Sequence, residues 1–337
     1  MSFRSAFFRC LAITAFLLSA AHAEGSALCP IFLQKFDGLH IPQSQIDEAK
    51  TRIDPEWLSE TLFLVPRNDG EALRAVNILG ALRAPHFKVS AQTWGATLDR
   101  EPLPEDLLKK VKRVVVFEMP GPRAEERLRQ KGLEVVVLDH HFYGDVDRRD
   151  PRSSLEQLME LLRWPASATD LAIAINDRSY VPGLKKAGLM GEMIFQIRKY
   201  DLQAQGEKDI ERSRRRAQDL IPKLEKRGGV YIMTESDVSI GGNYVKQELA
   251  IQSPDGLSSV LELFAHKIGF SGKPAVAKKL LAFDFTALGY AKGSYAQYGG
   301  GDAELSMFFG FKPKAPPDGE KDLIPRRVID EILKLLE

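Results

Sequence analysis

The sequence predicts an α/β protein in which a parallel sheet, covered by helices on both faces, is followed by a smaller α/β region. Short runs of apolar and mostly β-branched residues recur between residues 60 and 180, and helical segments separate them. Solid apolar strands that alternate with helices are typical of parallel sheets, because the crossover helices cover both faces.

The first region begins with an expected helix over Gln43–Arg52 and then alternates between strands and helices. The spacing of Leu73, Val76 and Leu79 indicates an amphipathic helix after the first strand. The expected strands are Thr61–Pro66, Val114–Phe117, Val135–Leu138 and Leu171–Ile175, and the expected helices are Glu71–Leu82, Ala124–Lys131 and Ser154–Leu162.

The second region follows a charged segment, Lys208 to Lys226, which predicts a solvated linker helix ending at Gly228 and Gly229. Beyond it we expect a strand at Val230–Met233, a helix near Leu257–Ile268, a strand near Leu280–Thr286, and a helix or strand at Met307–Phe311. The predicted parts are a signal peptide at 1–23, a first domain at 30–200, a linker helix at 201–228 and a second domain at 229–337.

The first 23 residues follow the pattern of a secretory signal peptide. Arg4 and Arg9 precede an apolar run, Leu11–Leu18, and Ala21 and Ala23 are small residues at the expected cleavage site. An uncleaved N-terminal anchor is the alternative, although the apolar run is short for a membrane span. Cleavage would leave a periplasmic or secreted protein without a membrane segment. Its net charge would move from +1 to −1, which argues against long nucleic acid as a partner.

Acidic and histidine side chains follow the predicted strands at the point where each strand ends. In chain order they are Asp69 with Glu71, Glu118, Asp139 with His140 and His141, and Asp177. The carboxyl ends of parallel strands meet at one edge of a sheet, and ligands bind there. Because carboxylate oxygen and imidazole nitrogen are ligands of Mn²⁺, and carboxylates also of Mg²⁺, we predict a site for one or two of these ions.

These segments resemble the motifs of the DHH phosphoesterases, which include RecJ-type exonucleases, oligoribonucleases, cyclic dinucleotide phosphodiesterases and manganese pyrophosphatases. The resemblance covers most of residues 60–311. The matching segments are Asn68-Asp69-Gly70-Glu71-Ala72-Leu73, Val116-Phe117-Glu118, Leu138-Asp139-His140-His141, Ser153-Ser154-Leu155-Glu156, Ile175-Asn176-Asp177 and Gly299-Gly300-Gly301-Asp302. The resemblance implies a metal-binding DHH domain followed by a DHH-associated substrate-binding domain.

The family pattern implies two ligand sets that share Glu118. One ion would be held by Glu71, Glu118, His140 and Asp177. The other would be held by Asp69, Glu118 and a histidine at the position of Val65. Valine cannot ligate a metal, so this second set lacks a ligand, whereas the first is chemically complete.

The family pattern also implies which residues act on the substrate. Asp139, His140 and His141 are the expected catalytic residues, with His141 facing the substrate phosphate and Asp139 orienting the histidines. The expected substrate-binding residues are Arg178, which lies beside the motif acids, and the loop residues Gly299, Gly300, Gly301 and Asp302. Asp302 stands where the family has histidine and would repel a phosphate unless a metal or arginine intervenes.

The leading hypothesis is a metal-dependent phosphoesterase that hydrolyses a small phosphodiester or nucleotide-like substrate with metal-activated water, in a cleft between the domains. The alternatives are a catalytically degenerate exported protein that binds a nucleotide or other ligand without turnover, and an unrelated α/β protein with a chance Asp-His-His. Individual residues also have structural alternatives, such as a turn for Asp69, a cap for Asp177 and a tight turn for the triple glycine.

Overall fold

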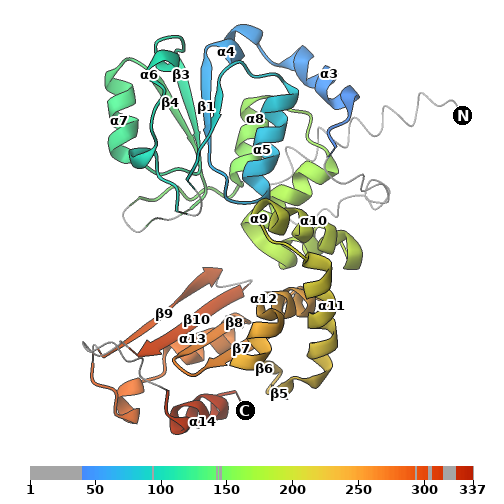
Figure 1. The fold of residues 1–337 in the computed structure, drawn as a ribbon, viewed down its shortest axis with the longest axis vertical. Coiled ribbons are helices and arrows are strands. Elements are labelled where there is room, and N and C mark those ends of the chain that lie inside the picture. Colours follow the sequence, from blue (N-terminus) through green and yellow to red (C-terminus); the bar gives the residue numbers. More distant parts are fainter. Residues whose placement is uncertain are drawn as a thin grey trace, which may run out of the picture.

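A computed structural model describes residues 40–92, 95–141, 143, 146–292, 294–302, 306–313 and 324–336, except for the side chains of 238–243, 298–302 and 306. The predicted signal peptide, 1–23, lies outside the described residues. Figure 1 shows two α/β parts, one above the other, with a group of helices between them. Within the described ranges, no helix combines the length and the apolar character that a bilayer span requires.

The first part is built on a four-stranded parallel sheet with the order β2-β1-β3-β4. Its strands are β1 (Thr61–Val65), β2 (Phe87–Val89), β3 (Arg113–Phe117) and β4 (Glu134–Leu138). Alternate residues of β1 and β3 point to opposite faces. Phe63 and Val115 pack in one core cluster and Leu64 and Val116 in another, so the sheet is buried on both faces, as predicted.

Helices cover both faces of this sheet (Figure 1). They are α3 (Gln43–Arg52), α4 (Pro55–Ser59), α5 (Gly70–Ala81), η1 (Leu98–Arg100), α6 (Glu105–Leu108), α7 (Pro122–Gln130) and α8 (Ser154–Leu161). The start of α5 is set by Asp69, whose Oδ1 accepts a hydrogen bond from the Ala72 amide at 2.9 Å. Ser153 and Glu156 form a reciprocal capping box at the start of α8.

The predicted strand at Leu171–Ile175 is wrong, because this segment lies inside the helix α9 (Ala168–Lys186). A capping box formed by Ser167 and Asp170 starts the helix. The apolar run then packs against the core, with Ile173 2% exposed. A short apolar run is compatible with a buried strand or a buried helix, and only the cap distinguishes the two here.

Two more helices, α10 (Gly191–Ala204) and α11 (Ile210–Leu220), continue from α9. The predicted solvated helix over Lys208–Lys226 corresponds to α11 only in part, because Glu225–Arg227 forms a strand, and one side of α11 is packed. Its Arg214 ion-pairs with Glu248 at 2.9 Å and lies over the ring of Phe195, 3.6 Å from the centroid. Arg214 therefore lies on the packed side of this helix, whereas Arg212, Arg215 and Arg216 are exposed, as the charged composition predicted.

The second part has a six-stranded mixed sheet with the order β5-β6-β7-β8-β10-β9. Its strands are β5 (Glu225–Arg227), β6 (Val230–Thr234), β7 (Ser259–Phe264), β8 (Lys267–Gly272), β9 (Tyr295–Asp302) and β10 (Ser306–Pro313). Only β6 and β7 are parallel among these described neighbours. The helices are η2 (Ile221–Lys223), α12 (Glu235–Gln252), α13 (Pro274–Leu281), η3 (Phe285–Leu288) and α14 (Arg326–Lys334).

Two predicted elements of this part are also wrong. The expected helix near Leu257–Ile268 is the hairpin of β7 and β8, since β7 is covered on both faces and therefore reads as a solid apolar run. The expected strand near Leu280–Thr286 is the end of α13 followed by η3, because Pro274 starts a helix whose Leu280 is buried. Met307–Phe311, for which both a helix and a strand were possible, lies in β10.

A buried ion pair joins α5 to α9. Arg74 Nε lies 2.6 Å from Asp170 Oδ1, and both side chains are at most 1% exposed. Asp170 also accepts hydrogen bonds from the Gln45 and Trp164 side chains. Burial tends to raise the pKa of Asp170, but Arg74 and Ser167 outweigh it and hold the pKa below its usual value.

Replacing Asp170 with alanine should lower the free energy of unfolding by about 3–5 kcal/mol, because several buried donors lose their common acceptor. The matched control is Asp330→Ala, which breaks an exposed pair with Arg326 and should cost less than about 1 kcal/mol. Urea unfolding followed by circular dichroism measures both changes. Equal losses in the two variants would contradict a special role for the buried pair.

Candidate metal centre

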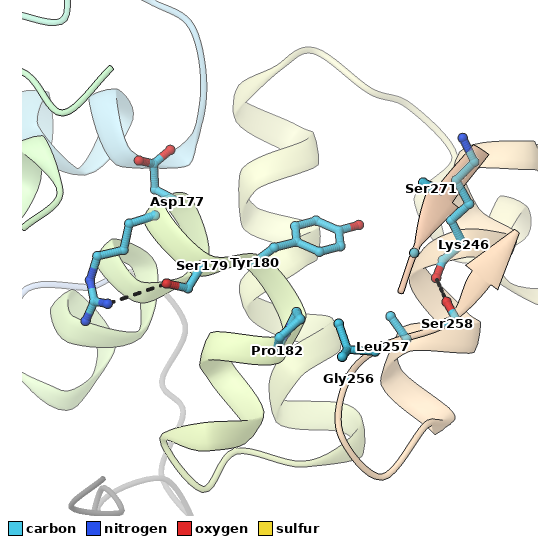
Figure 2. Close-up of a pocket in the computed structure, with 12 residues that line it drawn as sticks. Asp177, Ser179, Tyr180, Pro182, Lys246, Gly256, Leu257, Ser258 and Ser271 are labelled. Carbon is cyan, nitrogen blue, oxygen red and sulfur yellow. Dashed lines mark hydrogen bonds between the residues drawn. The ribbon is translucent and has the colours of Figure 1, made fainter. Parts of the chain in front are cut away.

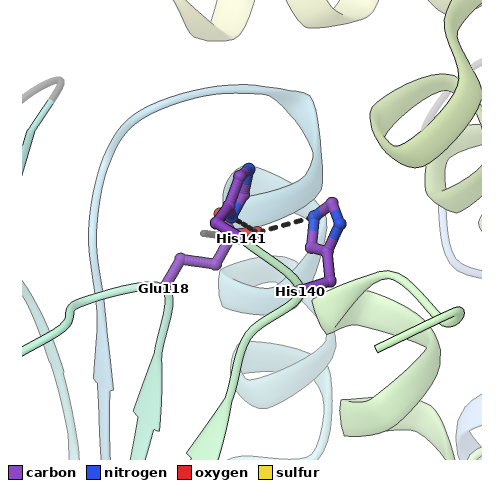
Figure 3. A group of neighbouring side chains, drawn as sticks. All are labelled: Glu118, His140 and His141. Carbon is purple, nitrogen blue, oxygen red and sulfur yellow. Dashed lines mark ion pairs between the residues drawn. The ribbon is translucent and has the colours of Figure 1, made fainter. Parts of the chain in front are cut away.

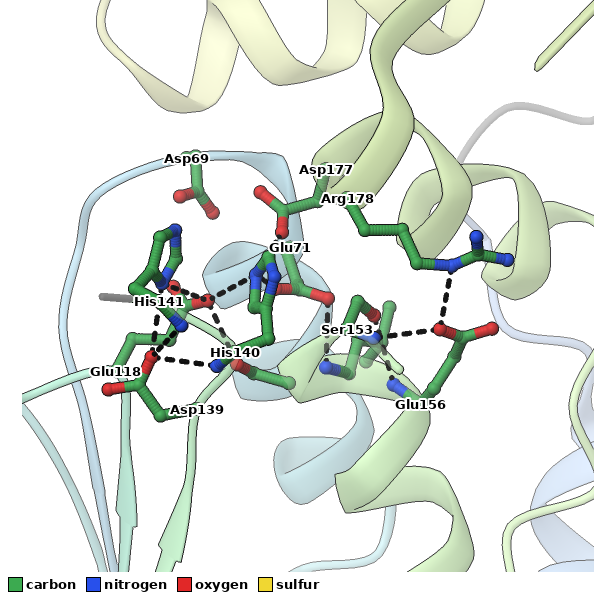
Figure 4. A network of polar contacts seen from close by, with 12 residues as sticks. Asp69, Glu71, Glu118, Asp139, His140, His141, Ser153, Glu156, Asp177 and Arg178 are labelled. Atoms are coloured by element: carbon green, nitrogen blue, oxygen red, sulfur yellow. Dashed lines mark hydrogen bonds and ion pairs between the residues drawn. The ribbon is translucent and has the colours of Figure 1, made fainter. Parts of the chain in front are cut away.

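The candidate site lies at the edge of the parallel sheet where β3 and β4 end (Figure 4). Glu118 directly follows β3, and Asp139 separates His140 from the end of β4. Glu71 lies in the first turn of α5, and Asp177 comes from the middle of α9. Two strand ends and two helices thus bring these ligand side chains together.

One ligand atom from each of Glu71, Glu118, His140 and Asp177 lies within 4.8 Å of the others. His140 Nε2 is 2.7 Å from Asp177 Oδ2, 3.3 Å from Glu118 Oε1 and 3.9 Å from Glu71 Oε2. This set of four is the one that the resemblance implied for a complete metal site. Asp177 reaches it from a helix rather than from the end of a strand.

Several buried polar atoms of this group have no hydrogen-bond partner among the described residues. They are Glu71 Oε2, His140 Nε2 and Asp177 Oδ2. His140 Nε2 and Asp177 Oδ2 are at ion-pair distance without hydrogen-bond geometry. Burying a polar atom without a hydrogen-bond partner costs folding free energy unless a water molecule or an ion binds to it. Three carboxylates and one imidazole fit a divalent cation such as Mn²⁺.

The ligand carboxylates are also held by the start of α8. Glu71 Oε1 accepts a hydrogen bond from the Leu155 amide at 2.8 Å, and Glu118 Oε1 accepts one from the Ser154 hydroxyl at 2.9 Å. The positive end of the α8 dipole also favours negative charge at this place. Sequence reasoning missed this supporting role, although Ser153 and Glu156 already showed the capping-box spacing.

Glu118 has a backbone φ of 47°, which is uncommon for a residue other than glycine. Such a conformation costs free energy and is maintained by its surroundings, and it occurs often at functional sites. Here it turns the chain directly after β3, and the Glu118 side chain reaches His140 (Figure 4). Glu118 also accepts a hydrogen bond from the Ser154 hydroxyl.

Asp139 organises the turn that carries both histidines. Its Oδ1 accepts hydrogen bonds from the amides of His140 at 2.8 Å and His141 at 3.0 Å, and from the Tyr143 hydroxyl at 3.2 Å. The same oxygen lies 3.0 Å from His141 Nδ1. Asp139 thus contacts the backbone of both histidines. It also contacts the ring of His141. Tyr143 was not foreseen from the sequence.

The two histidine rings differ in exposure. His140 is 10% exposed, whereas His141 is 44% exposed and lies 3.7 Å from Glu118 Oε1 through Nδ1 (Figure 3). Their ring centroids are 4.2 Å apart. His140 therefore points into the ligand cluster, and His141 lies at its solvent side.

Asp69 is buried near the cluster, but among the described residues it does not join the group of four close ligands. Its Oδ1 caps α5. Val65, at the position where the resemblance implied a histidine, is 1% exposed in the core. The second implied ligand set therefore consists of a capping carboxylate, a shared glutamate and an apolar side chain.

The cluster carries more negative than positive charge. Burial, with Glu118 and Asp177 nearby, raises the pKa of Asp69 to about 8, and burial with Asp177 and Glu118 raises the pKa of Glu71. Burial opposes the charged form of His140, but Asp177 and Glu118 outweigh it and raise its pKa to about 10. Burial likewise opposes ionisation of Asp177, yet His140 lowers the Asp177 pKa overall.

A cavity of about 400 Å³ adjoins the cluster and contains Asp177 in its wall (Figure 2). One side of it comes from α9 and the other from α12, β8 and the segment before β7. Arg178 lines this cavity, and its Nε lies 3.0 Å from Glu156 Oε2. This volume lies in the range typical of small-ligand sites.

The triple glycine does not form the expected loop. Gly299, Gly300 and Gly301 lie in β9 and pair with Phe309, Phe308 and Met307 of β10. The part of the cavity wall that the structure describes does not include them. The Asp302 side chain lies outside the described residues, and the substrate-binding role of this segment stays a prediction.

No protein-family model matches the sequence. No curated protein matches it either. Similar solved structures include a DHH-domain protein described as a member of a family of ribosomal proteins, at 15% identity and a TM-score of 0.42, over 99% of this chain and 98% of that one.

Two RecJ structures bound to manganese are also similar. One, titled exonuclease RecJ, has 11% identity and a TM-score of 0.33 over 88% of this chain and 94% of that one. The other, from Thermus thermophilus, has 14% identity and a TM-score of 0.35 over 89% of this chain and 55% of that one. The titles of these structures name members of the family that the motifs resemble.

Proposed function

We propose that this protein is a metal-dependent phosphoesterase that hydrolyses a small phosphodiester or nucleotide-like substrate. The observation that carries the proposal is the shared position of Asp177. It belongs both to the four-residue ligand cluster and to the wall of the 400 Å³ cavity. A ligand in the cavity would therefore lie against the metal centre.

Glu71, Glu118, His140 and Asp177 would hold one Mn²⁺ or Mg²⁺ ion. When bound, such an ion supplies Lewis acidity toward a phosphoryl oxygen and lowers the pKa of water. The start of α8 keeps the two glutamates in place through Leu155 and Ser154. The protein thus contributes a rigid, largely dehydrated ligand set.

His141, at the solvent side of the ligand cluster, would meet a substrate phosphate bound there. Its hydrogen bond with Asp139 raises its pKa above the usual value, although burial opposes this. With Nδ1 directed to Asp139, the other ring nitrogen can donate a hydrogen bond to a phosphoryl oxygen. A protonated imidazole there would stabilise the negative charge that develops during cleavage.

A second candidate function is binding of a nucleotide or similar ligand without turnover, in an exported protein. Val65 removes a ligand from the second implied metal set, and Asp69 is engaged as the cap of α5. Phosphoester hydrolysis often uses two metal ions, so a site restricted to one ion favours this candidate. The N-terminal pattern at 1–23 supports export to the periplasm or the medium.

Metal titration of the purified protein should show one tightly bound Mn²⁺ ion per chain, because only one of the two implied ligand sets is complete. Asp177→Asn should weaken binding by at least about tenfold, a loss that is typical even of residues that merely orient ligands. Asp106→Asn, which changes an exposed acid in α6, is the control and should leave affinity unchanged. Calorimetry measures both, and two equivalent tight ions would contradict the ligand assignment.

With Mn²⁺ present, the protein should hydrolyse bis-p-nitrophenyl phosphate, and His140→Ala should reduce turnover to the background level. His266→Ala is the matched control, since His266 lies in the turn between β7 and β8, away from the ligand cluster. Release of p-nitrophenol provides the measurement. No turnover with Mn²⁺ or Mg²⁺, together with saturable dinucleotide binding, would favour the second candidate.

The metal-free protein should lose stability as pH rises from about 4 to about 8. Asp69 has a pKa of about 8 in the folded protein, against 3.8 when unperturbed, so it stabilises the fold while protonated and loses that contribution as pH approaches 8. Asp69→Asn keeps a good helix cap. In EDTA, this variant should therefore unfold several degrees higher than wild type at pH 8 and at the same temperature at pH 4. A lower midpoint at pH 8 would contradict the raised pKa.

A further inference from the structure

Tyr180 is an aromatic side chain in the wall of the cavity that adjoins the metal centre. It lies three residues after Asp177 in α9 and is 38% exposed. Figure 2 shows its ring projecting from α9 into the space that faces Lys246, Ser258 and Ser271. An exposed ring at this place, within one helical turn of a ligand residue, is positioned to contact whatever occupies the cavity.

The backbone at Tyr180 is strained. Its φ of 51° and ψ of −150° interrupt α9, close to a region of backbone space that is nearly confined to glycine. Pro182 follows and is unable to donate the helical hydrogen bond at its own position. Because an unstrained helix would direct this side chain elsewhere, the kink is what brings the ring to the cavity.

One face of the ring is supported by Arg198, whose guanidinium carbon lies 4.2 Å from the ring centroid. Arg198 is itself fixed by hydrogen bonds to Asp201 at 2.6 Å, Gln247 at 3.1 Å and Asn176 at 3.2 Å. These partners come from α10, α12 and α9. The ring is therefore held in a defined orientation before any ligand binds.

The two cations in the described part of the cavity wall are both paired with carboxylates. Lys246 Nζ lies 2.7 Å from Glu262 Oε2, and Arg178 Nε lies 3.0 Å from Glu156 Oε2. Their charge is thus largely compensated. The remaining recognition features of the described wall are the Tyr180 ring and the hydroxyls of Ser179, Ser258 and Ser271. Such features suit a neutral planar ring with hydrogen-bonding edges better than a second anionic group.

We propose that Tyr180 is a specificity-determining residue on which a nucleobase of the substrate stacks, with Arg198 as the positioning residue behind it. Stacking there places the adjoining phosphate next to Asp177 and its neighbour ligands. This inference rests on the proposed function, and it narrows the substrate class from phosphodiesters in general to base-containing ones.

The first test compares two substrates of the Mn²⁺-loaded protein: the dinucleotide ApA and an analogue in which both bases are removed but the phosphodiester is kept. Tyr180→Leu should raise the KM for ApA about 5- to 150-fold, the loss expected for one stacked base. Tyr180→Phe, which keeps the ring, should retain the wild-type KM. All three proteins should have the same KM for the analogue. Equal effects of Tyr180→Leu on both substrates, or no effect on ApA, would overturn the proposal.

The second test separates this proposal from the question of turnover. Calorimetry measures binding of a non-hydrolysable phosphonate analogue of ApA to the Mn²⁺-loaded wild type and to Tyr180→Leu, with Tyr231→Leu as a control for loss of a tyrosine elsewhere. Binding that only Tyr180→Leu weakens supports the stacking role even if the wild type proves inactive. Absence of binding, or binding that Tyr180→Leu leaves unchanged, overturns it whether or not the wild type is a phosphoesterase.

Discussion

An excess of buried negative charge at one edge of the parallel sheet is the constraint on which the site depends. The close group has three carboxylates, those of Glu71, Glu118 and Asp177, and a single imidazole, that of His140. The positive charge of a protonated His140 can neutralise only one carboxylate. In a protein interior, such charges require protons, hydrogen bonds or a cation. The raised pKa of Glu71 favours its protonation, which removes one negative charge. A divalent cation would compensate the charge of the ionised carboxylates at neutral pH.

The surrounding structure makes that charge tolerable. Donors at the start of α8 hold one oxygen of each glutamate, and Asp139 ties together the turn that carries the histidines. Among the described residues, these contacts leave Glu71 Oε2 and Asp177 Oδ2 without hydrogen bonds and close to a common point. A site prepared in this way would bind an ion with little rearrangement, which is the main requirement for precise metal geometry.

Hydrogen bonds connect the ligand cluster to the cavity between the two parts of the molecule. Asp201 accepts a hydrogen bond from the amide of Gly70, at the start of the helix that carries Glu71, and it also pairs with Arg198. Arg198 contacts Gln247 in α12 and supports Tyr180. One buried network therefore links the candidate ligands, the cavity wall and the C-terminal part.

The sequence by itself determined the parallel sheet and the strand-end positions of Glu118 and His140, because β-branched runs are local properties. Its resemblance to a known family implied five candidate ligands, and the structure brings four of them close together. Only the tertiary structure decided that Asp177 comes from a helix, that Asp69 caps α5 rather than joining the close ligand group, and that the triple glycine lies in a strand. The position of the Tyr180 ring in the cavity wall was equally inaccessible. Its orientation depends on Arg198 and on a backbone kink, and such long-range contacts leave no periodic signal in the chain.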